Sequence, residues 1–375
     1  MEKPEVLSQR RENVRAAMKE HEVDALIIPR TERMATVDAR YLSGFTGSTC
    51  FIIVTEKKAF ISTDSRYTQQ ARKEVLGGMD IVEWDNGKHL LEEVIPRGLG
   101  NAKRLGFIAV DVTVAFHNSI KENIPSVELV PLPPFLANIR AVKSEEEIEK
   151  ITRSLRATEA ALEHAFTFVQ PGVSELEIAE AFENALPRGA KLAFESIVAS
   201  GERSIEAHGI ASDKIIEEGE VVQFDVGCSL DGYASDISRV VVCGRAAPEQ
   251  RKMHRAVLKA IDEALNFYKP GIATVEAHNR SQAELDSLGY AKDKFRHGLG
   301  HGVGLDVHEA PVVTSTTSSA LVTVFENKQV VTIEPGVYSE KLKFGMRVEC
   351  DVLITQDGHE VLDRLSTRLV ETGKL

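Results

Sequence analysis

The stretch HGLGHGVGLDVHE, residues 297–309, is the feature that most constrains the fold, because it interleaves three histidines with four glycines. A helix is disfavoured here, since each interior glycine costs about 1 kcal/mol relative to alanine. In a strand, alternate side chains point to opposite faces, so His297 and His301 share one face and only glycines occupy the other. The stretch therefore predicts a strand whose glycine face packs directly against another element.

The same stretch could in principle be a phosphate-binding loop. Such a loop needs a lysine after its glycines, or a strand–GxGxxG–helix context. Residues 297–309 contain no lysine, which disfavours this reading. A single histidine is usually packed or solvated, but three within twelve positions favour a binding or catalytic site.

Four other segments in the second half of the chain read as apolar strands that carry acidic residues. They are EVVQFDVG (220–227), DGYASDISRVVVCG (231–244), KQVVTIEPGVY (328–338) and MRVECDVLIT (346–355). In the last segment, strict alternation places Arg347, Glu349 and Asp351 on one face of a single strand. A carboxylate at the end of an apolar strand, such as Glu334, is costly unless it is paired or binds a metal.

Each acid has a simpler explanation when it is taken alone. Segment 346–355 could be an edge strand with a solvated face, and Asp225 could belong to a turn. Together with the histidine stretch, however, the acids favour one site. Four carboxylates and one imidazole, without a thiolate, suit a catalytic pair of Mn²⁺, Co²⁺, Mg²⁺ or Zn²⁺ ions rather than a structural zinc site. Two such ions activate water and polarise a carbonyl, which is the chemistry of a hydrolase.

The overall composition is ordinary for a soluble globular protein. The chain has 375 residues, 43% of them hydrophobic and 27% charged, which is enough for two or three domains. We expect no membrane span, because no apolar run reaches 18 residues. The net charge of −12 disfavours nucleic acid and anionic membranes as partners. The four cysteines form no CxxC pair, so we expect reduced thiols and a cytoplasmic protein.

The pattern of predicted elements changes near residues 140–143, where we place a domain boundary. The first domain, residues 1–140, reads as α/β, with Asp64 capping a helix. Its predicted strands are 24–29, 104–110, 127–132 and a hairpin over 51–63. The second domain, residues 143–375, begins with a capping box formed by Ser144 and Glu147.

A weak internal repeat runs through the second domain. The segments VQPGVSELEIAEAF (169–182) and YKPGIATVEAHNRS (268–281) both join two predicted helices through a Pro-Gly turn. This repeat predicts a duplicated helix-and-sheet unit with a site between its halves.

The order of these motifs resembles a known family. Asp225 and Asp236 with ten residues between them, followed by HGLGH, TIEPG and RVE, look like the pita-bread metallopeptidases, which include aminopeptidase P, prolidase and methionine aminopeptidase. YLSGFTGS (41–48) and TDSRY (63–67) are similar to the N-terminal domain of the Xaa-Pro members. The resemblance implies an α/β (α+β) chain, with a C-terminal pita-bread domain of pseudo-twofold sheet flanked by helices behind a smaller N-terminal α/β domain. It also implies a homodimer.

The resemblance further implies the residues of the site. The metal ligands would be Asp225, Asp236, His301, Glu334 and Glu349. They would hold two divalent ions, Mn²⁺ or Co²⁺, with Zn²⁺ as the alternative, and Glu334 would also act as general base. His208, His297 and His308 match histidines that face the substrate, and Arg347 matches an arginine that orients the cluster.

The implied activity is that of an Xaa-Pro aminopeptidase, which acts on peptides with proline at the second position. Prolidases commonly carry an arginine that contacts the free carboxylate of the terminal proline, at the position where Val312 stands. The alternative is a dipeptidase whose carboxylate clamp is Arg296 or Arg347. Creatinase-like hydrolases and non-catalytic binding modules of this fold lose ligands, whereas all five ligand types are present here. Two further departures are Ala207, where relatives often have proline, and Cys350, where relatives usually have aspartate.

Overall fold

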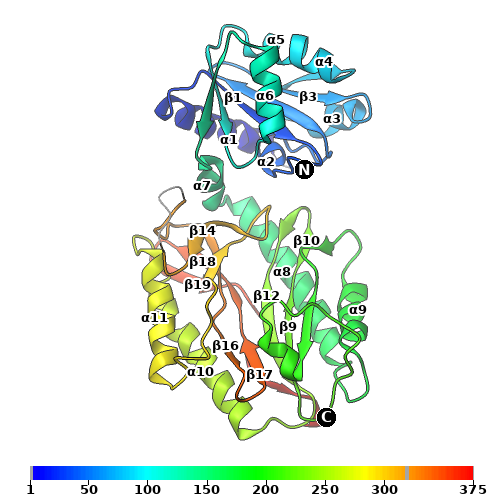
Figure 1. The fold of residues 1–375 in the computed structure, drawn as a ribbon, viewed down its shortest axis with the longest axis vertical. Helices are drawn as coiled ribbons and strands as arrows, with labels where there is room; N and C mark the ends of the chain where they lie inside the picture. Colours follow the sequence, from blue (N-terminus) through cyan, green and yellow to red (C-terminus); the bar gives the residue numbers. More distant parts are fainter. Residues whose placement is uncertain (1–2, 317–320, 375) are drawn as a thin grey trace. The chain divides into compact units, whose positions relative to one another are not determined.

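The computed structural model describes residues 3–316 and 321–374 (Figure 1). The chain divides into two compact units, Met1–Ile139 and Arg140–Leu375. Within the described ranges, no helix has the length and apolar character needed to cross a membrane.

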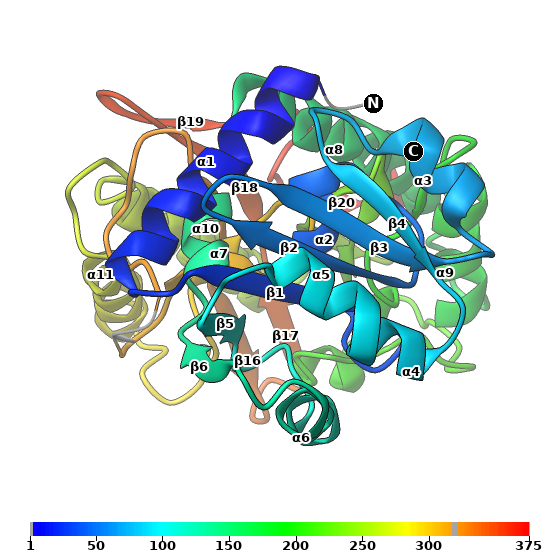
Figure 2. The ribbon, with the colours of Figure 1, turned by 90° about the horizontal axis from the view of Figure 1, so that it is seen from above.

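The N-terminal unit is built on a six-stranded sheet in the order β4-β3-β2-β1-β5-β6. Its strands are β1 (Ala25–Arg30), β2 (Cys50–Thr55), β3 (Ala59–Asp64), β4 (Asp80–Trp84), β5 (Arg104–Ile108) and β6 (Glu128–Leu132). Its helical segments are α1 (Pro4–Glu20), α2 (Asp38–Ser43), α3 (Thr68–Glu74), α4 (Gly87–His89), η1 (Leu90–Val94), α5 (Ile95–Leu99) and α6 (Val114–Asn123). Helix α7 (Phe135–Ala141) begins in this unit and ends in the next. Helix α1 covers one face of the sheet, while α5 and α6 cover the other (Figure 2).

The predicted strands and the hairpin of this unit are present, but the predicted helix cap is wrong. Helix α3 begins at Thr68, and Asp64 is the last residue of β3. The Asp64 carboxylate instead holds the turn that follows the strand. It accepts the backbone N–H of Arg66 at 3.0 Å and pairs with the Arg66 guanidinium at 2.8 Å.

The C-terminal unit consists of two halves, in each of which a helix pair packs on a sheet (Figure 1). Its helical segments are α8 (Glu145–Phe166), α9 (Glu175–Ala185), η2 (Gly201–Ile205), α10 (Pro248–Leu265), α11 (Thr274–Ser287) and η3 (Thr372–Lys374). Its strands are β7 (Lys191–Leu192), β8 (Ile197–Ser200), β9 (Val221–Val226), β10 (Cys228–Leu230), β11 (Tyr233–Ala234), β12 (Ile237–Val242), β13 (Gly300–Gly302), β14 (Glu309–Val313), β15 (Val330–Ile333), β16 (Gly336–Ser339), β17 (Phe344–Arg347), β18 (Cys350–Thr355), β19 (Gly358–Val361) and β20 (Val370–Glu371). The larger sheets have the orders β20-β12-β9-β8 and β14-β13-β15-β18-β19.

The predicted repeat is present in this unit. Helices α8 and α9 are joined through a turn at Gly172, and α10 and α11 through a turn at Gly271. Both glycines adopt positive φ angles, 93° and 84°, which favour glycine over other residues. The predicted capping box at Ser144 and Glu147 is also formed, with both of its hydrogen bonds.

The glycine face of the HGLGH motif packs as predicted. A Cβ atom on Gly300 would lie 2.1 Å from the carbonyl oxygen of Thr332, and one on Gly302 would lie 2.1 Å from that of Ala310. The strand itself is short, since β13 comprises only residues 300–302. Close backbone packing on both sides therefore fixes the position of His301.

The prediction of one continuous strand over residues 346–355 is wrong. Strand β17 ends at Arg347 and pairs with β16, whereas β18 begins at Cys350 and pairs with β15. Between them, the N–H of Glu349 donates to the carbonyl of Ser238 at 3.1 Å. Arg347 and Asp351 thus belong to different sheets, and Glu349 lies at the point where the chain passes between them.

Candidate metal centre

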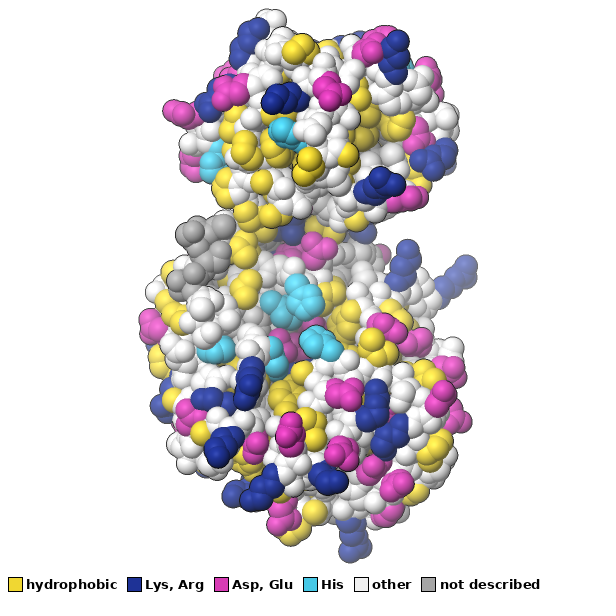
Figure 3. All heavy atoms as spheres, in the orientation of Figure 1, with side chains coloured by type: hydrophobic (Ala, Val, Ile, Leu, Met, Phe, Trp, Pro, Cys, Tyr) yellow, Lys and Arg dark blue, Asp and Glu magenta, His cyan; other side chains and the backbone are white. Residues whose placement is uncertain are grey.

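Four carboxylates and one imidazole converge in the C-terminal unit. Asp225 comes from β9, Asp236 immediately precedes β12, His301 lies in β13, Glu334 follows β15 and Glu349 separates β17 from β18. Their donor atoms form three overlapping sets, and within each set the atoms lie no more than 4.8 Å from one another. One of the sets also includes His308. Figure 3 shows histidine side chains gathered around acidic ones in a hollow on one face of this unit.

Strand pairing explains why these residues meet. β9 and β12 are antiparallel, with Asp225 opposite Ser238, so the turn between them returns Asp236 to the same end of the sheet. The Ser238 hydroxyl also donates to Glu349 at 3.0 Å. On the other side, the N–H of Glu334 donates to the carbonyl of Leu299 at 2.8 Å, which places this glutamate beside the histidine stretch.

The carboxylates are buried without enough hydrogen-bond donors. Asp225 is 9% exposed and Glu349 only 1% exposed. Among the described residues, one oxygen of each of Asp225, Asp236 and Glu349 is buried and has no hydrogen-bond partner. A buried, unpaired carboxylate oxygen is unfavourable unless a cation compensates it. This donor set fits a divalent metal, which oxygen-rich sites of this kind prefer.

Crowding and burial raise the pKa values of three of these acids, Asp236, Glu334 and Glu349. Burial, and then the neighbouring Glu349 carboxylate, raise the pKa of Asp236 well above its usual value. Burial and the charges of Glu334 and Asp225 do the same to the pKa of Glu349. Burial raises the pKa of Glu334 to about 8, against the opposing effect of Arg347. A bound cation would replace protons on these acids.

His301 presents a free ring nitrogen to the carboxylates. Its Nδ1 lies 3.1 Å from the carbonyl oxygen of Gly302, which requires the proton to be on Nδ1. Its Nε2 lies 3.6 Å from Asp236 and 3.8 Å from Glu334. Burial lowers the pKa of His301 to about 4, so the ring is neutral and its Nε2 lone pair is available to a metal.

Arg347 links several parts of the site. Its guanidinium pairs with Asp225 and donates to the hydroxyl of Tyr338 at 2.8 Å and to the carbonyl of Ala207 at 3.0 Å. It also donates to the Ser238 hydroxyl at 3.1 Å and is only 3% exposed. Because its donors are used inside the cluster, the suggestion that Arg347 could bind the carboxylate of a dipeptide is not supported.

Tyr338 is a site residue that the sequence analysis missed. Its hydroxyl accepts from Arg347 and lies 3.1 Å from Nε2 of His297. The pairing of β16 with β17 sets Gly336 opposite Arg347, and Tyr338 lies two residues further along β16 on the same face. Recognising this hairpin would have revealed the residue.

The three substrate-facing histidines predicted from the sequence surround the centre. His297 lies 3.9 Å from Glu334, and burial, with a further effect of Arg347, lowers its pKa to about 4. The exposed ring of His308 lies 4.3 Å, centroid to centroid, from that of His301. His208 lies on an exposed loop, and its charge contributes to a lowered pKa at both His297 and His308, after the larger effect of burial.

The strand that follows His308 is anchored by a buried ion-pair network. Glu309 pairs with Lys143 at 2.9 Å and with Arg140 at 3.3 Å, and it accepts the N–H of Asp306 at 3.0 Å. Although burial opposes ionisation, the two cations lower the pKa of Glu309. The loop that presents His308 is therefore fixed by charges on the segment before α8.

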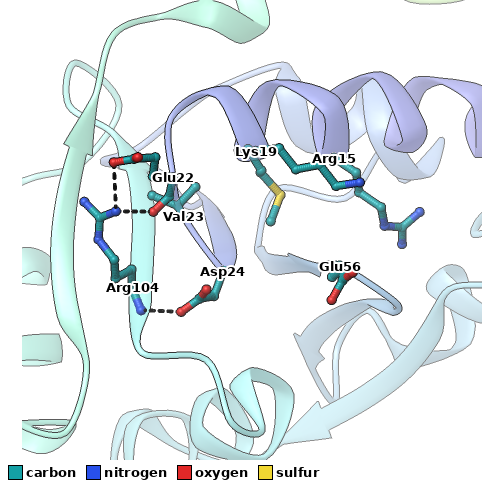
Figure 4. Close-up of a pocket in the computed structure, with 8 residues that line it drawn as sticks. Arg15, Lys19, Glu22, Val23, Asp24, Glu56 and Arg104 are labelled. Carbon is teal, nitrogen blue, oxygen red and sulfur yellow. Dashed lines mark hydrogen bonds and ion pairs between the residues drawn. The ribbon is translucent and has the colours of Figure 1, made fainter.

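A separate groove of about 570 Å³ lies in the N-terminal unit, beside the end of α1 and the starts of β1 and β5 (Figure 4). Arg104 pairs there with Glu22 at 3.6 Å, and the Asp24 carboxylate accepts two backbone N–H groups at 2.8 and 2.9 Å. Charges of both signs line the groove. Among the described lining residues no set of donor atoms gathers as closely as the carboxylates of the C-terminal unit do.

Comparison with known proteins agrees with this geometry. The model of metallopeptidase family M24 matches residues 149–356, and that of the creatinase/prolidase N-terminal domain matches residues 10–142. The chain belongs to metallopeptidase family M24. The two-domain pita-bread architecture expected from the sequence is thereby confirmed.

Relatives of this M24 peptidase match it over nearly the whole chain. An uncharacterized peptidase, YqhT of Bacillus subtilis, is 35% identical over 340 residues, which are 90% of this chain and 94% of that protein. The structure of an Xaa-Pro dipeptidase from Bacillus anthracis is 32% identical with a TM-score of 0.89, covering 97% of this chain and 99% of that one. The structure of an X-Pro aminopeptidase from Thermotoga maritima is also 32% identical, with a TM-score of 0.87, and covers 97% of this chain and all of that one (100%).

Proposed function

We propose that this M24 peptidase is an Xaa-Pro aminopeptidase that removes an N-terminal residue preceding proline. Its two divalent ions, Mn²⁺ or Co²⁺, would be held by Asp225, Asp236, His301, Glu334 and Glu349. The observation that carries the proposal is the set of buried carboxylate oxygens without donors that surrounds the free Nε2 of His301. Relatives named as Xaa-Pro peptidases support the substrate class.

When bound, the two ions supply Lewis acidity for the scissile carbonyl and lower the pKa of water. Glu334 is placed to act as a general base, since its carboxylate lies among the proposed metal ligands, where the attacking water would be held. It would take a proton from the attacking water and deliver it to the proline nitrogen as the carbon–nitrogen bond breaks. His208 and His308 are exposed and would hold the substrate by hydrogen bonds.

Val312 favours an aminopeptidase over a strict dipeptidase. In the pairing of β13 with β14 it lies directly opposite His301, so both side chains share the face that carries the metal cluster. Val312 is 37% exposed and can therefore contact the substrate. A valine cannot pair with a terminal carboxylate, and Arg347 is already engaged in the cluster.

The test compares Ala-Pro with Ala-Pro-Ala, after chelation and re-addition of Mn²⁺, Co²⁺ or Zn²⁺. We expect the tripeptide to be cleaved at least as fast as the dipeptide, most rapidly with Mn²⁺ or Co²⁺. Ala-Ala-Ala serves as the control for the proline requirement. Cleavage of the dipeptide alone would mean a dipeptidase, and no cleavage of either proline peptide would contradict the Xaa-Pro assignment.

Substituting Val312→Arg is expected to shift the enzyme toward dipeptides. A guanidinium on this face can pair with the carboxylate of Ala-Pro, and a charged hydrogen bond contributes about 1.5–3 kcal/mol. We expect the ratio of kcat/KM for Ala-Pro to that for Ala-Pro-Ala to rise about tenfold or more. Val312→Leu is the matched control and should leave the ratio unchanged. An equal fall for both peptides in Val312→Arg would show that residue 312 does not distinguish them.

A further inference from the structure

A single buried side chain joins both ends of the loop that presents His208. This loop, residues 201–211, is called here the His208 loop, and Glu175 lies beneath it with 0% of its side chain exposed. One carboxylate oxygen of Glu175 accepts from the N–H and hydroxyl of Ser200 at 2.7 and 2.8 Å. The other accepts from the N–H and hydroxyl of Ser212 at 3.2 and 2.7 Å. The two serines flank the loop, so one carboxylate closes its base.

Two arginines extend this connection into the loop. The Arg203 guanidinium pairs with Glu175 and also donates to the carbonyl of Ile210 at 2.8 Å, which ties the two arms of the loop together. Near the tip, the carbonyl of Ala207 accepts from Arg347, which itself pairs with Asp225 of the metal cluster. The backbone on the N-terminal side of His208 is therefore held from the cluster, and the base of the loop is held by Glu175.

Helix capping does not account for Glu175. This glutamate is the first residue of α9, but Ser174 and Glu177 already form a complete capping box at that helix end. A buried carboxylate is costly unless its oxygens are paired, and the partners that pair it here belong to the loop or flank it. The favourable position at a helix N-terminus adds to its stability as an anion.

We propose that Glu175 is a positioning residue that fixes the His208 loop so that His208 meets the substrate. This inference rests on the proposed function in assigning His208 to substrate contact. The claim that Glu175 fixes the His208 loop rests only on the hydrogen bonds around Glu175. Substituting Glu175→Gln keeps the size of the side chain but replaces one acceptor oxygen by a donor, so one end of the loop loses its anchor.

The first measurement is hydrogen–deuterium exchange of the metal-free protein. Glu175→Gln should speed exchange in peptides covering residues 201–212 about tenfold or more, while peptides from α10 exchange at the unchanged rate. Glu180→Gln, an exposed change on the same helix, is the matched control. Unchanged exchange in the loop would overturn the proposal, whether or not the protein cleaves Xaa-Pro peptides.

The second measurement is a double-mutant cycle with His208→Ala, using kcat/KM for Ala-Pro-Ala. Glu175→Gln should lower kcat/KM about tenfold when His208 is present and leave it unchanged when His208 is alanine, because its effect is transmitted through that histidine. Equal losses in both backgrounds would mean general destabilisation and would overturn the positioning role. If Glu175→Gln does not fold, Ser212→Ala takes its place, because it removes one anchor without leaving a buried charge unpaired. The same double-mutant cycle with His208→Ala then tests the positioning role, with a smaller expected loss of kcat/KM. A wild-type protein that cleaves neither proline peptide would refute the proposed function, while exchange still decides the role of Glu175 in the loop.

Discussion

Replacing Glu334 by glutamine, or His301 by alanine, is expected to abolish metal-dependent peptide hydrolysis while the protein stays folded. In the proposed function Glu334 is both ligand and general base, and a positioned base alone contributes about 10²–10⁴-fold. His301 offers the imidazole nitrogen of the donor set, 3.6 Å from Asp236. We therefore expect each substitution to lower kcat for Ala-Pro-Ala at least about a thousandfold.

The fold should survive because neither Glu334 nor His301 is charged in the metal-free protein near neutral pH, so neither holds the site together through an ion pair. Glutamine has the size of Glu334 and, like the protonated form that this side chain takes in the metal-free protein below pH about 8, it carries no charge. The position of His301 is set by the close backbone packing of β13 rather than by its ring. We expect the free energy of unfolding of the metal-free variants to fall by no more than about 1 kcal/mol relative to that of the unsubstituted protein.

The measurement is kcat at saturating metal, together with bound-metal content and thermal unfolding. Glu340 is exposed and lies in the turn between β16 and β17, so Glu340→Gln is the matched control and should retain full activity. An unchanged kcat in Glu334→Gln or His301→Ala, with metal supplied, would refute the ligand assignment. Loss of activity accompanied by unfolding would instead refute the claim that these residues are dispensable for the fold.

Much of the fold and of the candidate site can be predicted from residues that lie close together in the sequence. The capping box at Ser144, the Pro-Gly turns and the alternating glycines of HGLGH each depend on neighbours within a few residues, and the structure contains all three. Acids in apolar strands can also be recognised from their sequence neighbours. An apolar strand is expected to be buried, and burial of Glu334 or Glu349 is unfavourable without compensation. Such conflicts between a side chain and its surroundings are visible in the sequence itself.

Contacts between distant segments were not visible in this way. Glu175 looks like an ordinary acid in the first turn of a helix, and its partners lie 25 to 37 residues further along the chain. Tyr338 acquires its role only through a hairpin with Arg347. The break between β17 and β18 depends on Ser238, which accepts the N–H of Glu349 from more than a hundred residues away. Alternation alone predicted one strand there because it cannot show which sheet each residue joins.

The metal-free protein is expected to lose stability as the pH rises from about 6.5 to about 8, and a divalent metal should restore it. Glu334 has a pKa of about 8 in the folded protein and 4.5 ordinarily. Between pH 4.5 and about 8 the Glu334 carboxyl is ionised in the unfolded chain but protonated in the folded protein. The free energy of unfolding therefore falls as the pH rises. The raised pKa values of Asp236 and Glu349 act in the same direction. Each carboxyl that stays protonated contributes a slope of about 1.4 kcal/mol per pH unit.

The histidines act in the opposite direction, but in a lower pH range. His297 and His301 have pKa values lowered from 6.5 to about 4, so their effect raises stability between these values and is complete above pH 6.5. The decline should therefore be clear only above about pH 6.5. It is measured by thermal unfolding of chelated protein across that range, with a slope of roughly 3–6 °C per pH unit for each carboxyl.

Metal binding requires the deprotonated carboxylates, so Mn²⁺ should stabilise the protein more at pH about 8 than at pH about 6.5 and thereby flatten the decline. The matched variant is Glu334→Gln, which cannot take up the proton and should make the decline of the chelated protein shallower by up to about 1.4 kcal/mol per pH unit. A chelated protein that is as stable at the higher pH as at the lower would contradict the crowded carboxylate cluster. A decline that Glu334→Gln leaves unchanged would place its origin in carboxyls other than Glu334.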